Sequence, residues 1–386
     1  MSSLRVAVVG AGPAGATSAR LLAQMGAHVT LYDAKRLPRH KLCGGGLTPK
    51  ALPYIPTEAL GAIGRRVAEV DVVAGVRRDQ RLHLRLPGVE IAMVERAPFD
   101  FVLVQAAVAC GVELRDATSV VEVVPRDGSD GVDGVDVRTR AGTEMFDLVI
   151  AADGEPSRIA HRLGLGPLRS RALALEVDLP FATDRATNSL ELRYGVRGGY
   201  AWYFPKADHA NVGILTTDQS RQAGLRDELR GYIRELGLQP GDGRIAGHWI
   251  PMGLRRGGPV RGRVLLVGDA AGTADPFFGE GLSYAMASAG IAASTIRDWD
   301  SGRLPDLRVY EGRLRDALGR GFARMELAGR VNRRATWLAV TALRFSGWAR
   351  QEAVRAVNGT RVPFELPPFE VGRLEPSAAE MNATRR

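Results

Sequence analysis

A glycine-rich turn near the N-terminus has the spacing that dinucleotide-binding proteins use. It follows an apolar run at residues 4–9, which predicts a buried strand, and precedes a helix predicted over residues 13–25. In this context the first glycine permits a tight turn, the second lets the backbone approach a pyrophosphate, and the third allows close packing of helix on strand. The helix N-terminus adds oriented N–H groups for the phosphates. The residues assigned to this dinucleotide site are Gly10, Gly12, Pro13, Ala14 and Gly15.

A carboxylate and a second glycine-rich loop extend this site. Asp33 follows a strand predicted over residues 29–32, where it is placed to accept hydrogen bonds from a ribose. The segment 264–281 reads VLLVGDAAGTADPFFGEG, so a short apolar strand precedes Asp269, which would bind a ribityl chain. The loop after it would face an isoalloxazine ring, and an NAD dehydrogenase has no need of such a loop. We therefore expect non-covalent FAD, held at this end by Asp269, Pro276, Gly279, Gly281 and Leu282.

Several segments carry a family resemblance. The N-terminal turn, Ala152-Asp153-Gly154 with Ser157, and the loop at 268–272 resemble the motifs of the para-hydroxybenzoate-hydroxylase-like FAD oxidoreductases. Residues 41–49 (KLCGGGLTP) and 199–206 (GYAWYFPK) are similar to the geranylgeranyl reductase family. Members of that family saturate isolated double bonds in prenyl chains of lipids, chlorophyll precursors or menaquinone. The resemblance extends over about residues 4–325 and implies the same fold.

The resemblance also implies individual contacts to FAD. Arg96 supplies a cation that suits phosphate or flavin oxygens, with a surface ion pair as the alternative. Cys43 precedes three glycines, so it would line the site or supply a proton, unless it is a small packing residue. Val120 would give main-chain contacts to the adenine. The contacts implied in this way are Ala14, Asp33, Cys43, Gly44, Gly46, Arg96, Asp269, Gly281 and Leu282. Asp153 and Gly154 are also assigned to the cofactor site, and no motif fixes the position of Val120.

Aromatic residues mark a substrate wall. Tyr200, Trp202 and Phe204 alternate along a predicted strand and therefore share one of its faces. With Lys206 at its end, this wall suits a long apolar substrate with an anionic head group. The alternative is that the three rings form ordinary sheet core.

Composition excludes several classes of protein. The chain has 386 residues, a net charge of +9 and two cysteines, and it contains no CxxC, HExxH or P-loop spacing. Structural zinc, zincin chemistry and Walker-type NTP hydrolysis are therefore not expected, nor is any other metal. No secretory signal, transmembrane span or nucleic-acid motif is predicted. We expect a cytoplasmic protein whose oligomeric state the sequence leaves open.

The C-terminal part is basic and amphipathic. Arginines outnumber acids over residues 303–350, and Trp337, Leu338, Leu343, Phe345 and Trp348 are interleaved with them. Such a helix suits weak, peripheral association with an anionic membrane surface. The alternatives are that its apolar face packs on the FAD domain, and that the arginine excess reflects genome composition.

The predicted fold is α/β. It comprises a discontinuous Rossmann-like FAD-binding domain, an antiparallel-sheet substrate domain and a C-terminal helical region with a frayed tail. Alternation predicts strands over residues 67–94 and 172–217, and an amphipathic helix is predicted over 219–236. The expected domains are 1–70 with 95–165 and 258–300 for FAD, 71–94 with 166–257 for substrate, and 301–386 for the helical region.

Two reactions fit these residues. The first is saturation of C=C bonds in a geranylgeranyl-type chain by hydride transfer from reduced flavin, which needs no acid–base pair beyond one proton source. The second is an FAD-dependent monooxygenase or halogenase acting on an aromatic or polyketide-type natural product, because related enzymes carry similar aromatic strands. The glycine loop after Cys43 favours the reductase. The electron donor is left open between NAD(P)H and a ferredoxin.

Overall fold

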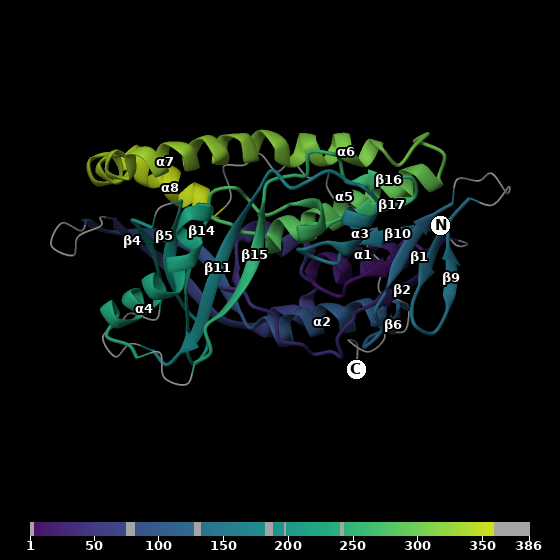
Figure 1. Cartoon of the computed structure of the whole chain (residues 1–386), viewed down its shortest axis with the longest axis horizontal. Helices are drawn as coiled ribbons and strands as arrows, with labels where there is room; N and C mark the ends of the chain where they lie inside the picture. Colours follow the sequence, from purple (N-terminus) through teal and green to yellow (C-terminus); the bar gives the residue numbers. More distant parts are fainter. Residues whose placement is uncertain are drawn as a thin grey trace, which may run out of the picture.

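Two sheets lie at opposite ends of the molecule, the parallel one at the right of Figure 1 and the larger one at the left. Helix α7 (Arg320–Phe345) runs along one side of the molecule toward the larger sheet. The tail from residue 362, expected to be frayed, lies outside the described residues. The computed structural model describes residues 4–74, 82–126, 133–181, 188–196, 198–239 and 243–358, with side chains except at 82, 83 and 331–340.

The first sheet has the nucleotide-binding topology that the N-terminal turn predicts. Its strand order is β16-β17-β10-β1-β2-β6, and all neighbours except β16 and β17 run parallel. The strands come from three distant parts of the chain, so the sheet is discontinuous and the predicted α/β class is confirmed. The strands are β1 (Arg5–Val9), β2 (His28–Tyr32), β6 (Glu113–Arg115), β10 (Leu148–Ala151), β16 (Val260–Arg261) and β17 (Val264–Leu266).

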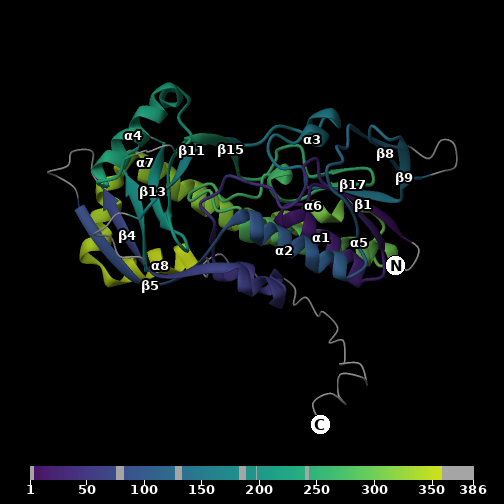
Figure 2. The same cartoon turned by 90° about the horizontal axis from the view of Figure 1, so that it is seen from below.

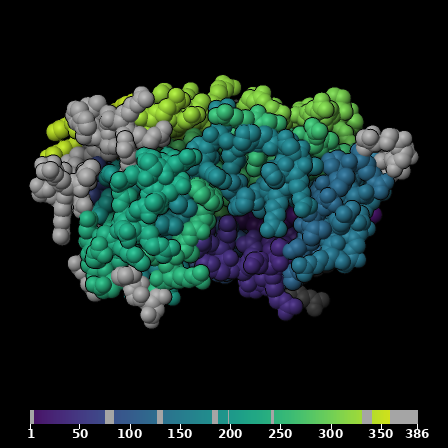
Figure 3. Space-filling model, viewed as in Figure 1, coloured from purple at the N-terminus to yellow at the C-terminus, as the bar shows by residue number. Residues whose placement is uncertain are grey.

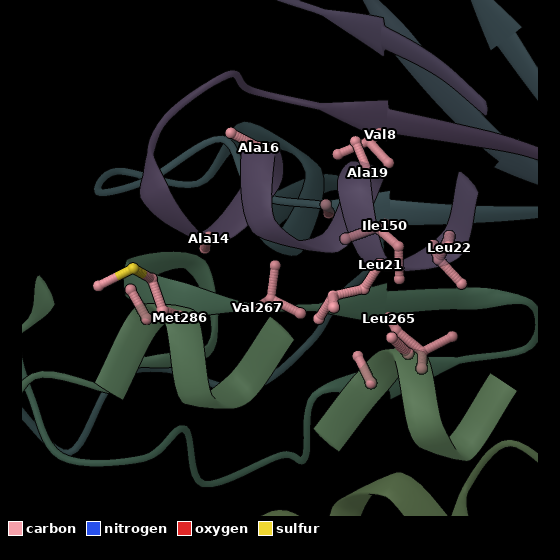
Figure 4. Packing of buried hydrophobic residues seen from close by; sticks show 14 of the residues in the cluster. Val8, Ala14, Ala16, Ala19, Leu21, Leu22, Ile150, Leu265, Val267 and Met286 are labelled. Carbon is pink, nitrogen blue, oxygen red and sulfur yellow. The ribbon is translucent and has the colours of Figure 1, made fainter. Parts of the chain in front are cut away.

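Helices cover this sheet and bury its apolar strands. Small residues such as Ala16 and Ala19 let α1 approach the strands, and the side chains of Leu21, Leu265 and Val267 lie between α1 and α5 in Figure 4. Both ends of α1 agree with the predicted helix to within one residue. The helices of this part are α1 (Pro13–Gln24), α2 (Arg96–Ala109), α3 (Arg158–Arg162) and α5 (Leu282–Asp300).

The second sheet is mainly antiparallel and has the order β15-β11-β14-β13-β12-β4-β5-β3. One face packs on α4 (Leu225–Glu235), which follows a 3-10 turn at Gln219–Gly224, so the helix predicted over 219–236 is two elements. The expected domain boundary at residue 70 falls inside β4. The strands are β3 (Gly46–Leu47), β4 (Ile63–Ala74), β5 (Leu82–Val94), β11 (Ser170–Leu179), β12 (Ser189–Tyr194), β13 (Gly199–Pro205), β14 (Ala210–Thr216) and β15 (Ala246–Met252).

The C-terminal helices close the other face of the second sheet. After α6 (Val309–Leu314) and a π-helical turn, α7 leads to α8 (Gly347–Asn358), which lies against β5 in Figure 2. The side chain of Asn358 accepts a hydrogen bond from Glu90 N and donates one to the Gly88 carbonyl, both at 2.9 Å. Within the described residues, no helix is both long and apolar enough to cross a bilayer. A small sheet of β7 (Glu122–Pro125), β8 (Val135–Arg138) and β9 (Thr143–Phe146) completes the fold.

Candidate functional site

A cavity of about 840 Å³ lies between the two sheets and is lined by residues of both. In Figure 3 the N-terminal segment (purple) is visible at the centre of the molecule, between the green-teal and the blue parts of the surface. The cavity combines the carboxyl ends of parallel strands with one face of the large sheet. This is the edge at which open α/β sheets bind their ligands.

The glycine-rich turn lines one end of the cavity. Gly10 has φ +105°, and a Cβ there would be 2.3 Å from the Ala152 carbonyl oxygen. A Cβ at Gly15 would be 1.8 Å from the Gly10 oxygen, so only glycine permits this helix–strand approach. No side chain of the described residues caps the start of α1. The start of α1, with Pro13 and Ala14, lines the cavity, so N–H groups that no side chain caps are available there to a pyrophosphate.

Asp33 anchors the ribose side of this turn. Its Oδ2 accepts hydrogen bonds from Ala11 N at 3.0 Å and from Arg39 Nε at 3.1 Å. The Asp33 carbonyl accepts from Thr118 N at 2.8 Å, so the segment carrying Val120 passes beside it along the cavity. The arrangement brings Asp33, a cation and an exposed main-chain segment together where a nucleoside would lie.

Arg96 is buried, which overturns the alternative of a surface ion pair. It makes two hydrogen bonds to Asp100, at 2.8 and 2.9 Å, and its guanidinium faces the Cys43 sulfur. Burial alone would lower the pKa of Arg96, but Asp100 and Cys43 outweigh it, and the pKa is raised. Arg96 therefore places a permanent positive charge on the cavity wall.

The loop after Cys43 lies against the aromatic wall. A Cβ at Gly44 would be 2.7 Å from Phe204 Cδ2, and one at Gly45, where φ is +74°, would be 2.1 Å from Lys206 Nζ. The glycines are needed because these side chains occupy the space. Lys206 does not line the cavity: its ammonium is buried and donates to the Val94 carbonyl at 2.7 Å.

Asp275 holds the loop that faces the cavity from the other side. Its carboxylate accepts hydrogen bonds from the backbone N–H groups of Phe277, Phe278 and Glu280, at 2.7 to 3.0 Å. Burial raises the pKa of Asp275 to about 6, against the effect of these bonds. Asp269 lies nearby, and burial also raises its pKa, opposed by the positive charges of Lys41 and Arg96. The loop therefore presents both a carboxylate and main chain to a ligand.

The aromatic wall forms the large-sheet side of the cavity. Tyr200, Trp202 and Phe204 line it in a row, with neighbouring ring centroids 6.0 Å apart. Trp202 Nε1 donates to Asn211 Oδ1 at 2.8 Å, which fixes the indole. The wall and core interpretations both hold in part, because Tyr200 and Trp202 are buried among sheet residues and yet line the cavity.

The structure places most of the predicted residues around this one cavity. Gly15, Pro276 and Lys206 are not among its lining residues. Among the described residues, no three His, Cys, Asp or Glu side chains are grouped to hold a metal ion. The predicted residues that line the cavity are Gly10, Gly12, Pro13, Ala14, Asp33, Cys43, Gly44, Gly46, Arg96, Val120, Asp153, Gly154, Tyr200, Trp202, Phe204, Asp269, Gly279, Gly281 and Leu282.

Among the lining residues that the sequence does not single out are two titratable ones, Glu176 and His248. Burial raises the pKa of Glu176 to about 7 and lowers that of His248 to about 4. They lie on neighbouring strands and point to the same face of the large sheet, because Ala174 pairs with His248 and Glu176 with Ala246. The sequence could have indicated Glu176, because it continues the alternation of Ala172 and Ala174 along the strand. Those two residues face the core, so a carboxylate in the same series is unusual.

The chain is similar to known flavoproteins. Residues 3–209 match the family described as FAD binding domain. The chain is 33% identical to geranylgeranyl diphosphate reductase of Synechocystis sp., over 76% of this chain and 75% of the relative. It is 30% identical to menaquinone reductase of Mycolicibacterium smegmatis, over 82% of each chain.

Solved structures share the fold. A geranylgeranyl bacteriochlorophyll reductase-like protein from Thermoplasma acidophilum superposes with a TM-score of 0.78 at 23% identity, covering 92% of this chain and 96% of that one. A flavin-dependent brominase superposes with a TM-score of 0.75 at 17% identity, covering both chains entirely. The uncapped helix N-terminus, the glycine turn and the two carboxylates at the cavity fit FAD. The chain belongs to the geranylgeranyl reductase family of FAD-dependent oxidoreductases.

Proposed function

We propose that this oxidoreductase saturates C=C bonds in a prenyl chain. The observation that carries the proposal is the position of the aromatic wall, which lines the same cavity as the dinucleotide turn. The wall therefore gives this cavity an apolar surface next to the residues that we assign to FAD. The named relatives act on geranylgeranyl and menaquinone compounds, both of which contain prenyl chains. An alkene needs an apolar, water-excluding site, and the wall supplies one.

The residues around the cavity divide into cofactor and substrate groups. The N-terminal turn, Asp33 and Arg96 would hold the diphosphate and ribose part of FAD, while Asp269 and the Gly279–Leu282 loop would hold the ribityl and ring part. When bound and reduced, FAD supplies the hydride. The wall orients the chain and keeps water from the alkene. The residues that we assign to the substrate are Tyr200, Trp202 and Phe204.

The cavity continues past the wall toward the C-terminal helices. Its lining there is apolar and comes from β5, β12, α7 and α8, with Ile91, Leu190, Leu192, Met325, Ala356 and Val357. This arm would accommodate the part of the prenyl chain that does not react. We do not assign the head group to Lys206, because its ammonium is already bound to the Val94 carbonyl.

One experiment separates the two candidate reactions. The purified flavoprotein is reduced with dithionite in the absence of oxygen, and geranylgeranyl diphosphate, menaquinone or air is then added. We expect fast reoxidation of the flavin by one prenyl compound, with loss of a C=C bond in the product by mass spectrometry. Slow reoxidation by every prenyl compound, together with substrate-dependent oxygen incorporation, would support the monooxygenase or halogenase.

We also propose weak association with anionic membrane surfaces. Around the junction of α7 and α8, Phe345 is 78% exposed and Trp348 is 67% exposed, and Leu327 is exposed further along α7. Arg344 adjoins these rings and Arg330 lies one turn from Leu327. Exposed aromatic and basic residues of this kind bind the interface of anionic bilayers. Side chains at 331–340, which include Arg333, Arg334, Trp337 and Leu338, lie outside the described ones.

A further inference from the structure

Glu176 occupies an unusual position in the large sheet. It lies on β11 on the face that lines the cavity, and its side chain is 3% exposed. Across the sheet it pairs with Gly213 of β14, which in turn pairs with Trp202 of β13. The carboxyl and the indole of the substrate wall therefore belong to one cross-strand row, with only a glycine between them.

The Cys43 amide donates a hydrogen bond to the Glu176 carboxyl, but one carboxyl oxygen is left for another partner. Glu176 Oε2 is buried and has no hydrogen-bond partner among the described residues. A structural carboxylate at this depth would be paired, because an unpaired buried charge is costly. An unpartnered oxygen that borders a cavity is instead available to a ligand.

The surroundings of Glu176 keep its protonated form populated at neutral pH. Burial and then the neighbouring Asp178 carboxylate raise the pKa of Glu176 to about 7, against the opposite effects of Lys206, the Cys43 amide and Arg96. A carboxyl of this kind holds its proton until the reaction and still releases it near physiological pH. The titratable and charged groups around it are Asp178 on its own strand, Lys206 after β13, Cys43 and Arg96 across the cavity, and His248 on β15.

Cys43 is the other candidate proton donor at the cavity. Its sulfur accepts a hydrogen bond from Gly45 N at 3.3 Å and faces the guanidinium of Arg96. Guanidinium and backbone N–H groups are donors only, so both of these contacts use the sulfur as an acceptor.

Polar side chains lie near Glu176 on the side of the sheet that leads to the protein surface. Asp178, two residues further along the same face, is half exposed and lies 3.6 Å from His209 Nε2. His209 Nε2 also lies 3.5 Å from Glu95 Oε1, and the rest of the Glu95 side chain is partly exposed. These groups would return a proton to Glu176 after each turnover.

We infer that Glu176 is the catalytic acid that protonates the alkene, an assignment that rests on the proposed function. When bound and reduced, FAD would supply one proton and two electrons together as hydride, and this hydride would form a C–H bond at one alkene carbon. The O–H bond of Glu176 breaks, and its proton forms the second C–H bond as the π bond is lost. The resulting carboxylate takes a proton from water by way of Asp178 and His209.

The test compares Glu176→Gln with Glu191→Gln in the FAD-loaded protein. Glu191 is a matched control, since it is buried in the same sheet but on the opposite face, where it accepts a hydrogen bond from Tyr232 at 2.9 Å. In single-turnover reoxidation by the active prenyl compound, Glu176→Gln should be slowed at least about 100-fold. FAD content and reoxidation by air should stay at wild-type levels, and Glu191→Gln should behave like the wild type.

A second readout does not depend on turnover. The absorbance of the oxidised flavin is titrated from pH 5 to 9, and we expect a step near pH 7 that Glu176→Gln removes and Glu191→Gln retains. If the wild type reacts with no prenyl compound, the proposed function fails, while this titration still decides whether Glu176 ionises beside the flavin. Absence of the step in the wild type overturns the inference.

Other outcomes also overturn it. Wild-type reoxidation by the prenyl compound in Glu176→Gln excludes Glu176 as the acid. Should Glu176→Gln lose FAD, Glu176→Asp replaces it. That variant keeps an acid but shortens its reach, so we expect slowed reoxidation with a shifted pH profile, and an unchanged rate and profile would exclude the assignment.

Discussion

The indole of Trp202 lies directly on Gly213 of the neighbouring strand, where a Cβ would be 2.1 Å from Cζ2 of the ring. The glycine thus creates the space in which the ring lies flat on the sheet, and the bond from Trp202 Nε1 to Asn211 holds it there. The orientation of the wall therefore depends on a residue that has no side chain.

Trp202→Ala should impair turnover of a prenyl substrate and leave FAD bound, because the ring contacts the substrate arm of the cavity. The truncation also costs about 3–5 kcal/mol of unfolding free energy. Turnover, FAD content and denaturant unfolding are measured together, with Gly213→Ala expected to reproduce the loss of turnover by displacing the ring. If Trp202→Ala fails to fold while Trp202→Phe turns over normally, the ring is only sheet core.

Asp269→Ala should weaken FAD binding about tenfold to a hundredfold. The variant removes a hydrogen bond between a charged acceptor and the polyol, which contributes about 1.5–3 kcal/mol. Flavin fluorescence titration of the apoprotein measures the dissociation constant. Asp269→Asn retains one acceptor oxygen and should lose less; wild-type affinity in Asp269→Ala would refute the polyol assignment.

Asp100→Asn should destabilise the holoprotein by about 3–5 kcal/mol, because it leaves the buried Arg96 guanidinium without its counter-ion. The free energy of unfolding is measured in denaturant. Asp227→Asn is the control, since it breaks an exposed pair with Arg230 and should cost about 0–1 kcal/mol. If the two variants lose the same unfolding free energy, burial does not make the Arg96–Asp100 pair more important than an exposed pair.

His248→Gln should reduce the loss of stability in acid. Burial first, and then Lys41 and Arg96, lower the pKa of His248 to about 4, so the unfolded chain binds a proton that the folded chain does not between pH 4 and about 6.5. Stability from His248 is therefore present at neutral pH and lost as the pH falls through this window, by about 3 kcal/mol in all.

The measurement for His248→Gln is the unfolding free energy at several pH values, taken as the difference from the wild type. This difference matters because Glu176 has the opposite effect: its raised pKa lowers stability as the pH rises from about 4.5 to 7. The same substitution at an exposed histidine, His161→Gln, serves as the control variant. If the unfolding free energy of His248→Gln changes with pH in parallel with that of the wild type, His248 is not a buried neutral imidazole.

Anionic vesicles should bind the protein weakly at low salt and release it as salt is added, since the attraction comes from arginine near the interface. Replacing Arg330, Arg333 and Arg334 with Glu should abolish binding in a vesicle sedimentation assay. Neutral phosphatidylcholine vesicles are the control. If the protein does not bind these vesicles at low salt, the arginine-rich surface of α7 simply faces water. A soluble substrate then becomes the stronger candidate.

Local sequence patterns determined the nucleotide end of the site. The turn from Gly10 to Gly15 specifies a strand, a tight turn and a helix within one short segment, so neighbouring residues alone decide its geometry. The alternation of Tyr200, Trp202 and Phe204 likewise places the rings on one face, because side-chain direction in a strand follows from its period.

Tertiary structure decided what these elements face. The sequence does not state the strand order that places Glu176 in the row of Gly213 and Trp202, since pairing joins residues far apart in the chain. The same holds for Lys206, whose ammonium meets the Val94 carbonyl instead of a ligand. For Arg96, burial rules out the alternative of a surface ion pair that the sequence leaves open. Secondary-structure propensity depends on a few neighbouring residues. The burial of a side chain and the partners that it contacts depend on which strands pair in the folded protein.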